Sequence, residues 1–573
     1  MKMKNKFFKL FLAVGFISLA ACETTELDLV VDPNTPSTDL LDVNFTFNNV
    51  QLSLPGYVNS INNFAQDVTR QTAMTGGTTY NTAYQEVSFN DIWGRGYGIL
   101  TDIKALEPKA TELGLNYQLG ASKVIRAYVL MSMADVFGDI PYSEALQGSA
   151  NLTPKFDNSA DVYLGALAEL NDAIALFGQP LTAFPTDDFY YPHGKTLPSA
   201  EASKAKWLTA ANTLKLKLMN TARLNGTALG LNVATEISNL IIANDLIDTP
   251  SEDFAFQYGN NRAVPNTRHP NYNTYYENAT TIGGSYLGNY MMWTVIGGFA
   301  PGEKAVNDPR RPFYFFRQDT NTVGESIFTL GCAFQSRPSH YSSAQYASFY
   351  QPTVLTPFCV ASTSGYWGRD HGDATGLPPD NSKRTVPGVY PAGGKFDTNT
   401  QASVQNNGVD GFQGAGIMPI LMTSWVHFMK AEAILTLGVS GDARVELEAG
   451  MRASIDKVIN FKSGGDIVVP TAVTINTYVN YVLNAYDTAT AAQRLEIVVK
   501  EFYIAAWGNG LEPYNNYRRT GFPSNMQPTL NAAVTDYFYT ALYPSDSTVN
   551  NSNAPTNSRT KRVFWDTANL VLN

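Results

Sequence analysis

The stretch RDHGD, residues 369–373, places two carboxylates and an imidazole close together in the sequence. Asp370, His371 and Asp373, with Asp380 nearby, supply oxygen ligands from a loop, an arrangement that can hold Ca²⁺. The alternative is a solvated or locally hydrogen-bonded loop, in which the aspartates cap neighbouring backbone amides. We favour the alternative and therefore expect no bound metal.

Other patterns of catalytic residues are missing from the sequence. None of the five histidines lies in a His-Glu-x-x-His motif and no Cys-x-x-Cys pair occurs, so no motif indicates zinc. No Gly-x-Ser-x-Gly motif marks a hydrolase nucleophile. Among 50 Asp and Glu residues a pair for glycoside hydrolysis can always be chosen, but none stands out. We expect no catalytic residue, no cofactor and no enzyme activity.

Aromatic residues in loop-like contexts are the best candidates for ligand binding. A sugar ring packs its apolar C–H face on Trp or Tyr, while Asn, Gln, Asp and Arg hydrogen-bond its hydroxyls. Packing in the core is the alternative for each of these rings. The predicted ligand-binding residues are Tyr366 and Trp367 first, and then Trp293, Tyr275 and Tyr276.

Cys22 follows a segment that is typical of secretion. Four of the first nine residues are lysines. The apolar run FLAVGFISLAA follows them and is too short to span a bilayer. Leu19-Ala20-Ala21-Cys22 resembles the bacterial lipobox, which implies cleavage before Cys22 and acylation of its thiol and new amino group. The alternative is a soluble secreted protein with an incidental cysteine. We favour a lipidated Cys22, because several acyl chains together anchor a protein stably.

The composition restricts the partners of this chain. The net charge is −10, so the chain has no electrostatic reason to bind the phosphates of nucleic acid. It has little attraction to anionic lipid either, so membrane attachment depends on the lipid anchor. Charged residues make up 16% and aromatic residues 12%, which suits recognition of neutral ligands. The remaining cysteines, Cys332 and Cys359, could form a disulfide in an oxidising compartment, with two buried thiols as the alternative.

Amphipathic and fully apolar helical patterns occur on both sides of a Gly- and Pro-rich middle region. Residues 122–137 are apolar nearly all round, which predicts a central buried helix that stops at Gly138. Further helices are predicted at 161–177, 207–222, 423–437 and 494–507. Tryptophans on such helical stripes are expected in the core: Trp93, Trp207, Trp425 and Trp507.

The predicted organisation has three parts. Residues 1–21 are a lipoprotein signal peptide, residues 22–42 a lipidated flexible leader, and residues 43–573 a single body. Within the body, a helical scaffold at 43–250 and 421–573 surrounds a loop-rich, ligand-facing region at 251–420. Two basic pairs, Arg518-Arg519 and Lys561-Arg562, are predicted structural partners of carboxylates.

Six stretches in order along the chain resemble the SusD/RagB family of outer-membrane lipoproteins from Bacteroidota. The region from GRDHGD to GVYPAGGKFD resembles the SusD-like branch of that family. The six stretches are VDPNTPS (31–37), IWGRGYGILTDIKALE (92–107), RAYVLMSMADVFGDIPYSEAL (126–146), KWLTAANTLKLKLMNTAR (206–223), FMKAEAIL (428–435) and EFYIAAWGNGLEPYNNYRRTGFP (501–523).

The resemblance implies a mainly α fold of irregular tetratricopeptide-like helical hairpins with a large loop-rich insertion. It also implies a place at the cell surface, where such a protein captures a glycan, or in some members an oligopeptide, and closes as a lid over a SusC-like TonB-dependent outer-membrane barrel. The acidic residues Glu23, Glu26 and Asp28 resemble the surface-export signal of these lipoproteins. The alternative is a structural or accessory subunit of an outer-membrane machine with no small ligand, because a fold does not fix a function.

Overall fold

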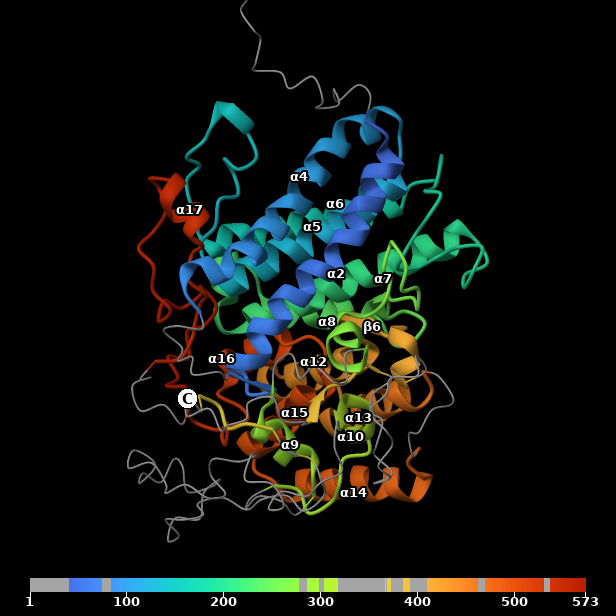
Figure 1. Ribbon diagram of the computed structural model, residues 1–573, viewed down its shortest axis with the longest axis vertical. Helices are drawn as coiled ribbons and strands as arrows, with labels where there is room; N and C mark the ends of the chain where they lie inside the picture. Colours follow the sequence, from blue (N-terminus) through green and yellow to red (C-terminus); the bar gives the residue numbers. More distant parts are fainter. Residues whose placement is uncertain are drawn as a thin grey trace, which may run out of the picture. The chain divides into compact units, whose positions relative to one another are not determined.

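The computed structural model describes residues 41–74, 84–277, 286–297, 303–317, 366, 368–372, 385–391, 410–461, 469–529 and 536–572. Contacts between Cα atoms divide the chain into two units, residues 1–42 and 43–573. The second unit is mainly α-helical, which confirms the predicted fold class (Figure 1). Cys22, Cys332 and Cys359 lie outside the described residues.

One group of helices comes from the first half of the chain, and each helix packs on the next. The group contains the predicted fully apolar helix, α5, and the predicted amphipathic helix, α6. Figure 1 shows these helices in blue to green. Its members are α2 (Val43–Val68), α4 (Asn90–Glu112), α5 (Asn116–Phe137), α6 (Ser159–Phe177), α7 (Ala200–Ala222) and α8 (Val233–Ala243).

A second group of helices comes from the C-terminal part. Helix α12 packs on α13 and α15, and α16 joins the two groups by packing on both α2 and α15. The members are α12 (Thr423–Leu437), α13 (Ala443–Ile459), α14 (Ala472–Thr488), α15 (Ala491–Ala505) and α16 (Leu511–Thr520), and a short helix α17 (Ser545–Asn550) follows.

Helix α5 is the central buried helix that the sequence predicts. Almost all of its side chains are buried, because it packs on α2, α4, α6 and α7 and leaves little surface to solvent. It ends at Gly138, whose φ of +82° suits glycine, and the Gly138 amide donates to the Ala134 carbonyl at 2.9 Å. The predicted core tryptophans Trp207, Trp425 and Trp507 are also buried, whereas Trp93 is half-buried.

Helix α2 is held against the start of α16 by a close backbone approach. A Cβ atom on Gly510 would lie 2.6 Å from the Gln66 backbone nitrogen, a distance that real Cβ contacts do not show. The Gly510 amide donates to Asn62 Oδ1 at 2.7 Å, so the glycine lets the two helices meet and hydrogen-bond. This contact fixes the position of α2, whose other face is available for a site.

Short antiparallel strand pairs occur in the middle region, and one of them, β1 with β3, joins it to the segment after α2. The pairs are β1 (Thr72–Ala73) with β3 (Tyr286–Leu287), β2 (Phe254–Gln257) with β6 (Ile417–Leu421), and β4 (Phe315–Arg317) with β5 (Thr385–Pro387). The described helices of the middle region are short: η5, a π-helix (Tyr272–Glu277), α9 (Asn289–Val295) and α10 (Arg311–Tyr314).

A buried ion network crosses between the two helical groups at Glu432 of α12. Arg519 of α16 contacts both carboxylate oxygens at 2.8 Å, and Arg223, just after α7, reaches Oε1 at 2.7 Å. Asn220 of α7 adds a hydrogen bond of 3.0 Å. The predicted pairing with carboxylates also holds for Lys561 with Asp139 and Arg562 with Asp566. It is wrong for Arg518, which bonds the Tyr539 carbonyl and Asn515 and lies over aromatic rings.

Candidate ligand-binding site

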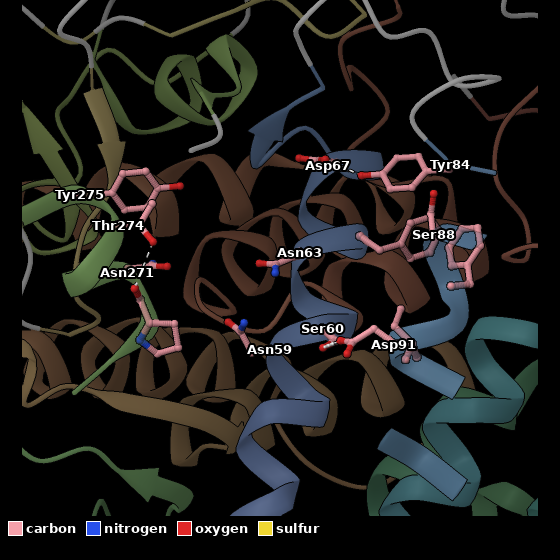
Figure 2. A pocket seen from close by; sticks show the side chains of 14 residues that line it. Asn59, Ser60, Asn63, Asp67, Tyr84, Ser88, Asp91, Asn271, Thr274 and Tyr275 are labelled. Carbon is pink, nitrogen blue, oxygen red and sulfur yellow. Dashed lines mark hydrogen bonds between the residues drawn. The ribbon is translucent and has the colours of Figure 1, made fainter. Parts of the chain in front are cut away.

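A cavity of about 430 Å³ lies between α2 and the segment that leads into η5 (Figure 2). This volume falls in the range typical of small-molecule sites. The third wall comes from Tyr84, a short 3-10 helix at Glu86–Phe89 and the first turn of α4. The lining residues are Asn59, Ser60, Asn63, Phe64, Asp67, Tyr84, Ser88, Phe89, Asp91, Ile92, Pro270, Asn271, Thr274 and Tyr275.

The α2 wall is a polar stripe on a helix whose opposite side is buried. Asn59, Asn63 and Asp67 recur every four residues and therefore lie on one face, while Phe64 belongs to the buried side. Asn63 is exposed and Asn59 half-buried. Among the described residues neither amide side chain has a hydrogen-bond partner, so both retain their donors and acceptors for a ligand.

The opposite wall is fixed by hydrogen bonds of its own. Asn271 donates from its side chain to the Gly388 carbonyl at 3.2 Å and from its backbone amide to His269 Nδ1 at 3.1 Å. Burial lowers the pKa of His269 to about 3, so this imidazole is neutral at pH 7 and Nδ1 can accept. Figure 2 shows Asn271, Thr274 and Tyr275 across the cavity from Asn59 and Asn63.

Tyr275 lines the cavity from a rigid aromatic cluster. It belongs to a buried set with Tyr272, Tyr276 and Phe316, in which the rings of Tyr276 and Phe316 stack with centroids 4.2 Å apart. Tyr275 is 6% exposed and is one of the residues that line the cavity. A ring held in this way contributes apolar contact with little loss of conformational entropy.

Two carboxylates of the cavity are held by internal donors. The hydroxyls of Thr72 and Tyr84 donate to Asp67, while burial raises the pKa of Asp67 above its ordinary value. Burial also acts on Asp91, but hydrogen bonds from Ser60 and Arg95 outweigh it and place the pKa of Asp91 below its ordinary value. Asp91 is therefore an ionised acceptor at neutral pH.

The cavity thus combines the amides of Asn59 and Asn63, hydroxyls and fixed carboxylate acceptors with the rings of Tyr84 and Tyr275. Such a lining can hydrogen-bond a ligand with many hydroxyls and pack on its apolar faces. A family model described as "Starch-binding associating with outer membrane" matches residues 34–360 and 381–541.

The chain belongs to the SusD-like family.

Solved structures agree with this assignment at the level of the fold. A SusD/RagB family protein from Bacteroides thetaiotaomicron is 18% identical, with a TM-score of 0.64 over 92% of this chain and 99% of that one. A chitin-binding SusD homologue from Flavobacterium johnsoniae is 18% identical, with a TM-score of 0.58 over 92% of this chain and 98% of that one. No curated protein matches the chain.

Of the predicted ligand residues that the structure describes in this SusD-like chain, only one lines the cavity. Tyr275 lines it, whereas Tyr276, Trp293 and Tyr366 are 1%, 2% and 3% exposed and pack among other residues. The Arg311 guanidinium lies 4.6 Å from the centroid of the Tyr366 ring. Trp367 lies outside the described residues. Burial of this degree favours packing, the alternative role, for the three rings in this conformation.

The described part of the RDHGD loop, residues 369–372, is buried. The prediction was a solvated or locally hydrogen-bonded loop, and the solvated form of it is wrong. Asp370 and His371 are fully buried, and Asp370 Oδ1 accepts from Asn289 at 3.0 Å and from Gln527 at 2.6 Å. Burial, with the nearby Arg70, holds the pKa of His371 well below its ordinary value. The loop is hydrogen-bonded to distant segments, and Asp373 and Asp380 lie outside the described residues.

Several residues of the cavity were not identified from the sequence. Asn59, Ser60 and Asn63 have polar types at helical spacing, which is the pattern of an ordinary solvated helix face. Tyr84 and Asn271 come from separate segments that approach α2 only in the folded chain. The one available signal was the spacing of Asn59, Asn63 and Asp67, which places three polar residues on one face of a helix whose other face is buried.

Proposed function

We propose that this SusD-like chain binds a neutral glycan in the cavity between α2 and residues 270–275. The observation that carries the proposal is a pair of amide side chains, Asn59 and Asn63, that have no hydrogen-bond partner among the described residues. They lie across the cavity, which has a volume of about 430 Å³, from Tyr275 (Figure 2). A pyranose could pack on the ring and exchange hydrogen bonds with the amides. The family description and the chitin-binding homologue support starch-like or chitin-like ligands.

The rest of the proposal concerns location and delivery. None of the described helices combines the length and apolar character needed to cross a membrane. We propose that acylated Cys22 anchors the protein to the outer membrane, facing the cell surface. There it acts as a lid that passes the bound glycan to a SusC-like TonB-dependent transporter, without turning the glycan over.

Asn63→Trp tests the binding site. The indole would occupy the cavity, so we expect affinity for maltohexaose or chitohexaose to fall by about tenfold or more, as measured by titration calorimetry. Asn63 is exposed, so its replacement should leave the melting temperature within a few degrees of wild type.

Leu52→Trp is the matched control, since Leu52 is an exposed residue of α2 outside the cavity. It should bind as wild type does. Unchanged glycan affinity in Asn63→Trp would refute this cavity as the site. If oligopeptides bound there and oligosaccharides did not, the ligand class would be wrong. Stable association with a barrel, without any small ligand, would favour an accessory subunit.

A further inference from the structure

A second cavity, of about 600 Å³, lies between α14 and α15 and is separate in its residues from the first. Its walls are completed by residues 303–304 and 524–525. The lining residues are Glu303, Lys304, Tyr481, Val482, Ala485, Thr488, Ala489, Gln493, Glu496, Ile497, Lys500, Glu501, Ser524 and Asn525.

The basic side chains of this cavity are already paired. Lys500 Nζ lies 2.7 Å from both carboxylate oxygens of Glu303, which also accepts from Asn525 at 2.8 Å. Lys304 Nζ lies 2.5 Å from Glu501 Oε1 and 2.7 Å from the Tyr478 hydroxyl. Because the carboxylates of Glu303 and Glu501 neutralise these two lysines, the cavity walls offer no attraction to an anionic ligand.

Glu496 adds an acceptor that is not paired with a cation. One of its carboxylate oxygens accepts the Ser524 amide at 3.0 Å and also the Ser524 hydroxyl. The second oxygen of Glu496 keeps its capacity to accept from a ligand hydroxyl. Gln493 and Thr488, on the same walls, supply further neutral polar groups.

Tyr481 presents an aromatic ring at the edge of this cavity. The residue is 37% exposed, and among the described residues its hydroxyl has no hydrogen-bond partner. The apolar part of the lining comes from the small side chains of Ala485 and Ala489 and from Val482 and Ile497. An exposed ring that shares a cavity with apolar side chains and neutral polar groups fits the C–H face and hydroxyls of a pyranose.

We propose that the α14–α15 cavity is a second binding site for neutral saccharide. The inference extends the proposed function, since it takes glycans as the ligand, but it uses no residue of the first cavity. The Tyr481 hydroxyl and the second carboxylate oxygen of Glu496 can both hydrogen-bond ligand hydroxyls, which favours a saccharide over an apolar peptide side chain. Two sites on one chain would also raise the apparent affinity for a polysaccharide that reaches both.

The test combines substitutions at the two cavities. Ala485 is exposed, so Ala485→Trp places bulk in the second cavity, while Asn480→Trp places the same bulk on an exposed part of α14 outside it. The probes are maltotriose and chitotriose, followed by ligand-observed NMR. In the Asn63→Trp background we expect residual binding, which the added Ala485→Trp removes and the added Asn480→Trp leaves unchanged.

The second site would be overturned if the Asn63→Trp protein bound no probe. It would also be overturned if the Asn63→Trp protein still bound a probe after Ala485→Trp was added. Binding lost in Ala485→Trp alone and unaffected by Asn63→Trp would support the second site and overturn the first. A wild-type protein that binds neither probe would count against both. Binding of trileucine that Ala485→Trp removes, without saccharide binding there, would make this a peptide groove and overturn the proposal.

Discussion

Cys22→Ser should move the protein almost completely from the membrane fraction to the soluble fraction. Each buried CH₂ of an acyl chain contributes about 0.8 kcal/mol, and a multiply acylated cysteine therefore anchors stably. Serine has no thiol to carry the acyl group, so the proposed anchor cannot form. Detergent-phase partitioning and the mass of the N-terminal peptide would measure the change.

Cys332→Ser is the control for that experiment, because it removes a cysteine outside the lipobox-like segment. It should leave partitioning into the detergent phase unchanged. A Cys22→Ser protein that stayed in the detergent phase, or an unmodified N-terminus on the wild-type protein, would refute the anchor at Cys22.

Glu432→Gln should lower the free energy of unfolding by about 3–5 kcal/mol, because it leaves two buried guanidinium groups without their counter-charge. Arg519 and Arg223 both contact Glu432, which joins α7, α12 and α16 in the core. The side chains of all three are at most 4% exposed, so water cannot replace the lost carboxylate charge.

The same variant should show a defined pH dependence. Burial opposes ionisation of Glu432, but Arg519 and Arg223 outweigh it and lower the pKa of Glu432 to about 2. The folded protein therefore binds a proton at this site less readily than the unfolded chain does. This contribution is complete above the unfolded pKa near 4.3 and is lost as the pH falls toward 2, so wild type and variant should converge in acid.

Denaturant unfolding of the two proteins between pH 7 and pH 3 would measure both effects. Glu448→Gln is the control, since its ion pair with Arg452 lies on the exposed face of α13 and should contribute less than about 1 kcal/mol. If Glu432→Gln cost no more than the control, the network would not have the structural role assigned to it.

The helical scaffold could be predicted because the spacing of apolar residues that marks a helix can be seen in a single sequence. The segment predicted at 423–437 is α12, residues Thr423–Leu437, and the all-round apolar stretch is the buried α5. The predicted start of α7, residue 207, is seven residues too late. It begins at Ala200, where the Ser199 hydroxyl accepts from the Ala202 amide, but its first two turns carry no apolar stripe.

The site was less predictable, because burial in the middle region depends on contacts between distant segments. Tyr276 and Trp293 have polar or glycine-containing neighbours that suggest loops, yet Tyr276 stacks on Phe316 and both rings are buried. The RDHGD loop has solvent-compatible residue types, but its Asp370 is buried and accepts hydrogen bonds from Asn289 and Gln527. Neither partner is close in sequence, so local patterns could not reveal these contacts.

The most direct test of glycan capture is a crystal structure of the mature protein grown with maltohexaose or chitohexaose. We predict a sugar ring in the cavity beside Tyr275, with its hydroxyls within hydrogen-bond distance of the Asn59 and Asn63 side chains. A saccharide bound elsewhere on the protein, with this cavity holding only water at saturating ligand, would contradict the assignment.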